Sequence, residues 1–212
     1  MKKMHTLCHL RWERYDPTNY VRTRQWMMGG AAAVVLVLSG CVTQSRYNTM
    51  LSQQQAIEAA QRQQMATLQA SLQSEIDADQ VKIEQLENGI RVRMSSDLLY
   101  PSGSVMLSHQ GRAALTKVSG QLSTMAAQGY NIDVVGNTDD VPIGRELAAR
   151  YPTNWELAGA RAAEVVRHLQ ESGVDPTKLE AISNGHYHPV AANDSAEERM
   201  RNRRTDIVLR PQ

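Results

Sequence analysis

Apolar residues recur every three or four positions between residues 44 and 90, a segment rich in Gln, Ala, Glu and Leu that contains no proline. The spacing predicts one long helix over this segment, with the apolar side chains on a single face. A weak coiled coil between two copies would bury that face. The alternative is a partly disordered polar tether, because Asp79 interrupts the apolar stripe and Gln54 and Gln61 dilute it. A helix of about 46 residues would be roughly 70 Å long.

Beyond residue 90 the pattern changes to short β-branched segments that alternate with helical repeats. Strands are predicted over four segments, residues 91–95, 130–137, 179–185 and 205–210. Helices are predicted over about 108–128, 154–172 and 196–203, each preceded or begun by a capping residue. This alternation predicts an α+β fold, with helices on one face of a small mixed β-sheet, over residues 91–212. About 120 residues can form a core without a metal or a disulfide.

The first 40 residues have the pattern of a secretory signal peptide rather than of a core. Arg22 and Arg24 precede an apolar run from Gly29 to Leu38, and small residues follow it. The run is much shorter than the about 20 residues that span a bilayer. The stretch before Arg22 is long for a signal peptide. A translation start further along the chain is therefore an alternative.

The sequence Leu-Ser-Gly-Cys, which ends at Cys41, resembles the lipobox of bacterial lipoproteins. The resemblance implies cleavage before Cys41 and the attachment of acyl chains such as palmitate, which together give stable membrane anchoring. Inner-membrane lipoproteins have Asp at the position of Val42. The resemblance therefore implies that the lipoprotein is sorted to the outer membrane. An ordinary signal peptide with a chance cysteine is the alternative. The chain then divides into a signal peptide (1–40), a lipid-anchored helical stalk (41–90) and a globular domain (91–212).

Composition excludes several classes of partner. The formal net charge is +1, so no strong electrostatic field attracts the chain to nucleic acid or to an anionic membrane. The chain has no Phe and few other aromatic residues, which makes a base-stacking surface improbable. Cleavage would remove Cys8 and leave Cys41 alone, so no intramolecular disulfide is expected.

One carboxylate and one guanidinium are predicted on neighbouring elements of the globular domain. Asp139 follows the strand over 130–137, and Arg161 lies in the helix that begins near residue 154. Such a pair can bind a ligand that bears both an ammonium and a carboxylate. It can equally form an ordinary salt bridge within the domain.

Four ordered motifs resemble the peptidoglycan-binding OmpA-like domain, the family that includes OmpA, Pal and the C-terminal part of MotB. They are LLYPSGSVMLSHQG at 98–111, G-x-T-D at 136–139, N-x-x-L-x-x-x-R-A at 154–162 and N-R-R at 202–204. The resemblance covers roughly residues 92–210. It implies a domain that binds meso-diaminopimelate in the stem peptides of peptidoglycan. The segment from Val141 to Glu156 is similar to the MotB branch of the family.

The resemblance also implies a role for each matching residue. Asp139 takes the ligand's ammonium, and Arg161 takes its carboxylate through a bidentate fork that Lys cannot reproduce. Asn154 stands where a helix N-terminus favours an anion. The supporting residues are Thr138, which would orient Asp139, and Ser102, Gly103 and Ser104, whose loop would offer backbone hydrogen bonds.

The N-R-R motif has two interpretations: Arg204, with Asn202 and Arg203, either lines the site or braces the last strand. Trp155 is interpreted as a residue that packs near the helix cap. Three positions depart from the family pattern, and they put ligand selectivity rather than binding in doubt: Asn137, Asp140 and Ala158.

No metal, cofactor or catalytic residue is expected. His186 and His188, with His168, suggest a metal site, but no acidic or cysteine partner has zinc-like spacing. A wall peptidase or amidase would need a nucleophile with a base or an open metal site, and neither G-x-S-x-G nor H-E-x-x-H occurs.

The leading hypothesis is a non-catalytic lipoprotein that faces the periplasm and tethers the outer membrane to peptidoglycan. The alternative is an accessory subunit of an envelope machine, such as a Tol–Pal-like, secretion or stator-like assembly, that uses the same wall-binding domain. The expected partners are peptidoglycan, the outer membrane through the lipid anchor, and a second copy through the stalk. No nucleic acid is expected.

Overall fold

A computed structural model describes residues 44–212 of the chain. The expected signal peptide, Cys8 and the expected lipidation site at Cys41 lie outside the described residues. The chain divides into two units, residues 1–47 and 48–212, and the second contains the fold discussed below. Within residues 44–212, no helix is both long enough and apolar enough to cross a membrane.

The centre of the fold is a five-stranded mixed sheet in the order β1-β2-β5-β3-β4. Only the β3–β4 pair is parallel, and the other neighbours are antiparallel. The strands are β1 (Val81–Leu86), β2 (Gly89–Ser95), β3 (Tyr130–Asn137), β4 (Leu179–Gly185) and β5 (Arg204–Pro211). The predicted α+β fold with a small mixed sheet is therefore confirmed.

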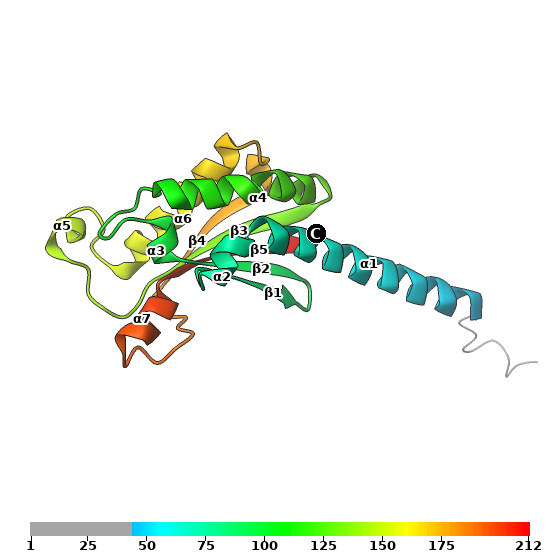
Figure 1. The fold of residues 1–212 in the computed structure, drawn as a ribbon, viewed down its shortest axis with the longest axis horizontal. Coiled ribbons are helices and arrows are strands. Elements are labelled where there is room, and N and C mark those ends of the chain that lie inside the picture. Colours follow the sequence, from blue (N-terminus) through cyan, green and yellow to red (C-terminus); the bar gives the residue numbers. More distant parts are fainter. Residues whose placement is uncertain (1–43) are drawn as a thin grey trace, which may run out of the picture. The chain divides into compact units, whose positions relative to one another are not determined.

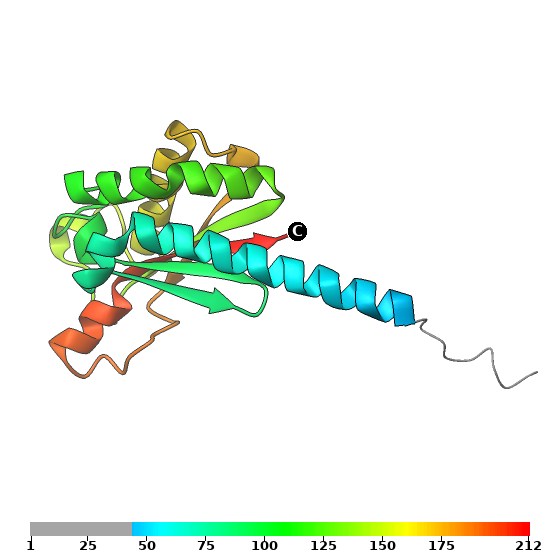
Figure 2. The same ribbon diagram turned by 45° about the vertical axis from the view of Figure 1, so that its right-hand side comes forward.

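Helices pack on one face of this sheet, as Figures 1 and 2 show for α4 and α6. Both helices begin at a hydroxyl cap, Ser108 for α4 and Thr153 for α6, and the second cap is a full capping box with Glu156. The helices are α1 (Gln44–Ser71), α2 (Gln73–Asp77), α3 (Ser96–Leu99), α4 (His109–Ala127), α5 (Arg145–Ala148), α6 (Asn154–Glu171) and α7 (Ala196–Asn202), with a 3-10 turn, η1 (Pro176–Lys178).

The core lies between these helices and the sheet. Alternate strand residues such as Val134 and Ile207 are fully buried against helix residues such as Leu115 and Leu169. The residues between them point to the other face, where Arg93 and Asp206 pair across β2 and β5 at 3.0 Å. One apolar face and one charged face explain why the long helices α4 and α6 both pack on the same side.

The prediction of a single helix over 44–90 is wrong beyond residue 77. Asp79 has φ 56°, which ends the helical segment, and β1 and β2 then form a hairpin with a two-residue turn between Leu86 and Gly89. Ile83, Leu86 and Ile90 fit a helical repeat, but the segment from Val81 also alternates in strand fashion. Gly89 has φ +146°, and a Cβ there would lie 2.0 Å from the carbonyl oxygen of Leu209.

The second half of α1 is part of the domain rather than of a free stalk. Leu68 and Leu72 are fully buried in the core. Gln64 donates a hydrogen bond of 2.8 Å to Gln128 at the end of α4. Side chains from residue 48 to residue 60 are all exposed, so a spacer can only comprise the part of α1 before Gln61.

Candidate functional site

The strand register brings three distant segments together at one end of the sheet. Ser95 at the end of β2 and Asn137 at the end of β3 are both paired with Arg204, the first residue of β5. The residues just outside these strand ends, Asp97, Asp139 and Arg203, therefore converge. The arrangement is a consequence of antiparallel pairing on both sides of β5.

Asp139 is held by two donors at this end. Its Oδ2 lies 2.9 Å from Nη1 of Arg203, and its Oδ1 accepts a hydrogen bond of 3.2 Å from the amide of Val141. Arg203 also lies 3.8 Å from Asp97, whose side chain is more than half exposed. The Asp139 side chain is largely buried, with 11% of it exposed.

The loop that carries Asp139 is fixed by its neighbours rather than by Thr138. The side-chain amide of Asn154 donates to the carbonyl oxygens of Asp139 and Val141, at 3.3 and 3.2 Å. The amide of Thr138 donates to the carbonyl of Gly185 at 2.8 Å. The buried hydroxyl of Thr138 has no hydrogen-bond partner among the described residues, so it does not orient Asp139.

Arg161 lies on α6 and reaches the loop between α3 and α4. Its Nε and Nη2 both donate to the carbonyl oxygen of Ser104, at 3.1 and 3.0 Å. Its guanidinium carbon stands 4.9 Å from the centre of the Tyr100 ring, a cation–π distance. The Tyr100 hydroxyl in turn donates to the main-chain carbonyl of Arg161 at 2.9 Å. Arg161 is thus positioned by an aromatic ring and a loop carbonyl.

The close approach of α6 to β3 depends on a residue without a side chain. A Cβ on Gly136 would lie 2.2 Å from the carbonyl oxygen of Ala158, so only glycine allows this contact. Ala158 itself is buried at the same contact. The two small residues bring the helix with Arg161 next to the strand that leads to Asp139.

The two charges remain separate, although the Asp139 carboxylate acts on Arg161. No ion pair joins Asp139 to Arg161 in the part of the chain that the structure describes. Burial lowers the pKa of Arg161, and the Asp139 carboxylate acts in the opposite direction. Burial also raises the pKa of Tyr100 to about 12. An ordinary salt bridge between Asp139 and Arg161 is therefore not what the structure contains.

Asn202 and Arg204 brace the domain. Asn202 is fully buried, and its side chain bonds the main chain of Val190 and Ala191. All three guanidinium nitrogens of Arg204 donate within the domain, to Asp206, to the Asn202 carbonyl and to the His188 carbonyl. Of the two interpretations of the N-R-R motif, the geometry favours bracing for these two residues, because Arg204 is buried and each of its guanidinium nitrogens already donates within the domain.

Two contributions were not assigned from the sequence. Arg203, which contacts Asp139, was left with its neighbours between lining the site and bracing the last strand. Tyr100, which lies beneath Arg161, was quoted only as part of the first-loop motif. A signal existed for Tyr100, because an aromatic residue directly before Pro101 in a loop motif suggests a contact surface. No sequence signal distinguishes Arg203 from Arg204, since only the strand boundary separates them.

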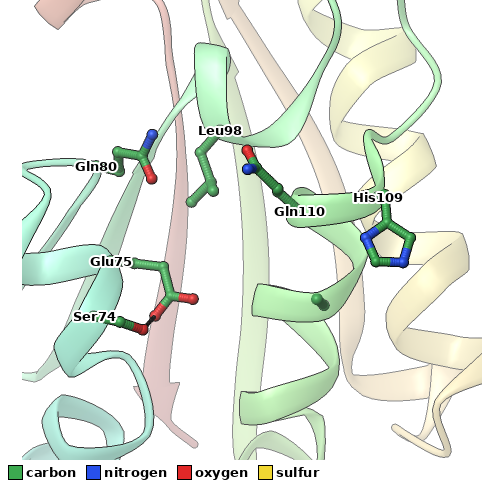
Figure 3. A pocket seen from close by; sticks show the side chains of 7 residues that line it. Ser74, Glu75, Gln80, Leu98, His109 and Gln110 are labelled. Carbon is green, nitrogen blue, oxygen red and sulfur yellow. Dashed lines mark hydrogen bonds between the residues drawn. The ribbon is translucent and has the colours of Figure 1, made fainter.

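Two surface cavities lie outside the Asp139–Arg161 site. One, of about 280 Å³, lies between α2, α3 and α4 (Figure 3). Its one carboxylate, Glu75, is engaged by Lys117 at 2.7 Å and by Ser74 at 2.8 Å. The other, of about 330 Å³, is lined by the start of β1 and the end of α7 and includes Arg203. Neither cavity includes Asp139 or Arg161.

Two of the three histidines considered for a metal site make other contacts. His168 lies 3.1 Å from the Thr116 hydroxyl, and His186 stacks on Tyr187. Among residues 44–212 no group of three or more His, Cys, Asp or Glu side chains is placed to hold a metal ion.

Known proteins resemble this domain in sequence and in fold. Residues 99–203 match the OmpA family, a span that includes Tyr100, Asp139 and Arg161. The solved structure of the cell wall anchor of the T6SS from Pseudomonas aeruginosa is 32% identical, with a TM-score of 0.61, and the match covers 68% of this chain and 97% of that one. The chain belongs to the OmpA family. Residues 99–203 of its α+β fold form the domain of that family.

Two relatives extend the comparison. Motility protein B of Helicobacter pylori is 31% identical over 127 residues, which is 60% of this chain and 48% of that protein. The probable lipoprotein YiaD of Escherichia coli is 29% identical over 147 residues, 69% of this chain and 63% of YiaD. The OmpA family chain thus spans only about half to under two thirds of the length of these relatives. None of the three relatives has the name of an enzyme.

Proposed function

We propose that this OmpA family chain is a non-catalytic envelope lipoprotein that binds diaminopimelate in the stem peptides of peptidoglycan and tethers the outer membrane to the wall. The observation that carries the proposal is the separation of Asp139 and Arg161. Each charge is held by its own partner at the same end of the sheet. A ligand with an ammonium and a carboxylate on one carbon can satisfy both.

In the proposed complex Asp139 accepts the ligand's ammonium, because a carboxylate keeps acceptor capacity beside Arg203 and Val141. Arg161 has an Nη1 that makes no hydrogen bond to the described residues, and this nitrogen is the donor we assign to the ligand's carboxylate. Asn154 acts as a positioning residue through its side-chain contacts with the loop, whereas Thr138 contributes only its main-chain amide. Ser102 and Gly103, exposed in the first loop, are the neighbours best placed to add backbone hydrogen bonds.

Co-sedimentation of the purified protein with isolated sacculi tests this binding. Arg161→Lys keeps the charge but loses the fork on Ser104, so affinity should fall about tenfold or more. Arg167→Lys is the matched control, because Arg167 lies on the same helix with a 60% exposed side chain. Asp139→Ala combined with Arg161→Ala should abolish binding while the thermal unfolding transition remains cooperative. Wild-type sedimentation by that double variant would overturn the site.

The membrane attachment is proposed on a separate basis. It is supported by the lipobox-like sequence at Cys41 and by the similarity to a probable lipoprotein. The proposed spacer is shorter than the sequence alone suggested, because it ends before Gln61. The part of α1 before Gln61, about 17 residues, reaches roughly 25 Å. Cys41→Ala should move the protein from the membrane fraction to the soluble periplasmic fraction, and unchanged fractionation would contradict the anchor.

Self-association through α1 is a further part of the proposal. Met50, Leu51 and Ile57 are large apolar residues that are 65%, 40% and 60% exposed on this helix. A second copy would bury them in the manner of a short coiled coil. Sedimentation equilibrium should give a dimer for the wild type and a monomer for Ile57→Gln. A wild-type protein that stays monomeric at high concentration would contradict self-association through α1 and leave the proposed wall binding untouched.

A role in an envelope machine is the second candidate. The similarity to Motility protein B and to the cell wall anchor of the T6SS favours it. The same domain would then hold a protein assembly, rather than a membrane, against the wall. Cross-linking in living cells discriminates between the two, because a simple tether gives no stoichiometric protein partner.

A further inference from the structure

Two large aromatic side chains are stacked on each other but remain half exposed. The ring centres of Trp155 and Tyr187 are 5.2 Å apart with an angle of 27° between the planes. His186 extends the stack, with its ring centre 4.1 Å from that of Tyr187. Trp155 is 45% exposed and Tyr187 is 59% exposed. We call these three residues the aromatic platform.

Packing near the helix cap does not account for the platform. An aromatic residue that serves packing is buried, as Tyr100 is at 3% exposure. The inner edge of Trp155 does contact the protein, since a Cβ on Gly185 would lie 3.5 Å from Trp155 Cδ2. About half of each of these two side chains stays in water, and adjacent exposed aromatic rings of this kind suit a ligand that has an apolar face.

The platform is rigidly joined to the Asp139 loop. Trp155 directly follows Asn154, whose side chain holds the carbonyl oxygens of Asp139 and Val141. Gly185, the residue before His186, accepts the hydrogen bond from the Thr138 amide. The Ser183 hydroxyl donates to the Trp155 carbonyl at 2.8 Å, which fixes α6 to β4 beneath the platform. Figure 1 shows α6 beside β4.

We propose that the platform binds pyranose rings of the glycan strand to which a bound stem peptide is attached. This inference rests on the proposed function, in which Asp139 and Arg161 hold the third residue of that peptide. Three extended residues span at most about 11 Å, so a sugar must lie close to the site. A pyranose ring has a face of C–H groups that suits the electron-rich face of an aromatic ring, and a rim of hydroxyls that stays hydrated.

Titration of the purified full chain with two probes tests the platform. The first probe is the free stem tripeptide with diaminopimelate, and the second is the same tripeptide on its N-acetylglucosamine–N-acetylmuramic acid disaccharide. The wild type should bind the second about tenfold more tightly than the first. Trp155→Ala and Tyr187→Ala should each lower that ratio severalfold and leave tripeptide affinity within about twofold. Trp155→Phe, which keeps a ring, should retain most of the ratio.

Matched variants separate the platform from the charged site. Met200→Ala removes another side chain of 45% exposure, on α7, and should leave both affinities unchanged. Asp139→Asn should weaken both probes alike. An unchanged ratio in folded Tyr187→Ala and Trp155→Ala, with normal tripeptide binding, would overturn the platform alone. A wild type that binds neither probe would overturn the platform and the proposed function together.

Discussion

Arg203 Nη1 lies 2.9 Å from Asp139 Oδ2, so the carboxylate proposed for the ligand is already paired with a cation of its own domain. The pair joins the end of β3 to the start of β5. Arg203 leaves part of the carboxylate free, and it fixes the direction in which the remaining lone pairs point. We therefore regard Arg203 as a positioning residue for Asp139.

Replacement of Arg203 tests this role. Arg203→Gln should weaken diaminopimelate binding roughly fivefold, about 1 kcal/mol, because the carboxylate loses a charge-assisted hydrogen bond that orients it. Isothermal titration measures the change, with Arg201→Gln, at a 66% exposed side chain two residues away, as the control. A rise in affinity would instead identify Arg203 as a cation that competes with the ligand's ammonium.

A single methyl group should separate α6 from β3. Gly136→Ala places a Cβ 2.2 Å from the Ala158 carbonyl, so we expect a loss of about 2–4 kcal/mol in the free energy of unfolding. Gly159→Ala on α6 is the matched control, because its Cβ would lie 3.6 Å from Ser183 Cβ in ordinary contact. This helical substitution should stabilise the protein by up to about 1 kcal/mol. Equal effects in urea denaturation would contradict the close approach.

The charged face of the sheet should make stability depend on pH. A hydrogen bond from Lys82, aided by Arg93 and Arg91, lowers the pKa of Glu84 below its ordinary value of 4.5. Its ionised form therefore stabilises the fold above about pH 4.5, and this contribution is lost as pH falls through the lower, folded-state pKa.

Glu84→Gln should flatten the acid side of the stability curve. The variant should be less stable than the wild type at pH 7, by about 1 kcal/mol, and the two should converge below pH 4. Urea denaturation across pH 3–7 measures both curves. Glu58→Gln, on the exposed part of α1, serves as the control. Parallel curves for Glu84→Gln and the wild type would show that the three cations do not act on this carboxylate.

The residues explain which parts of this structure a sequence can predict. Strands such as β3 and helices such as α6 combine a clear repeat with caps and glycine ends, so local rules determine them. The β1–β2 hairpin was missed because Ile83, Leu86 and Ile90 satisfy helical spacing, although the segment after Val81 also alternates as a strand does. Asn88 and Gly89 carried the turn signal that favours the hairpin.

The site was predictable in its elements but not in its contacts. Asp139 and Arg161 follow from motifs, whereas the separation of their charges depends on Ser104 and Arg203, which strand register and loop packing bring in from other segments. The half-exposed state of Trp155 was likewise not predictable, because a residue near a helix cap can pack or project equally well.

Titration with free meso-diaminopimelate, followed by backbone amide NMR, tests the central claim most directly. The ligand should shift the amides of Val141, Ser104 and their neighbours, and Asp139→Asn should remove these shifts. Nα-acetyl-L-lysine amide keeps a side-chain ammonium but has no carboxylate, so it should leave the amides near Arg161 unchanged. Equal shifts with this lysine derivative, or no shifts at this end of the sheet with diaminopimelate, would contradict the claim that Asp139 and Arg161 together recognise a zwitterionic terminus.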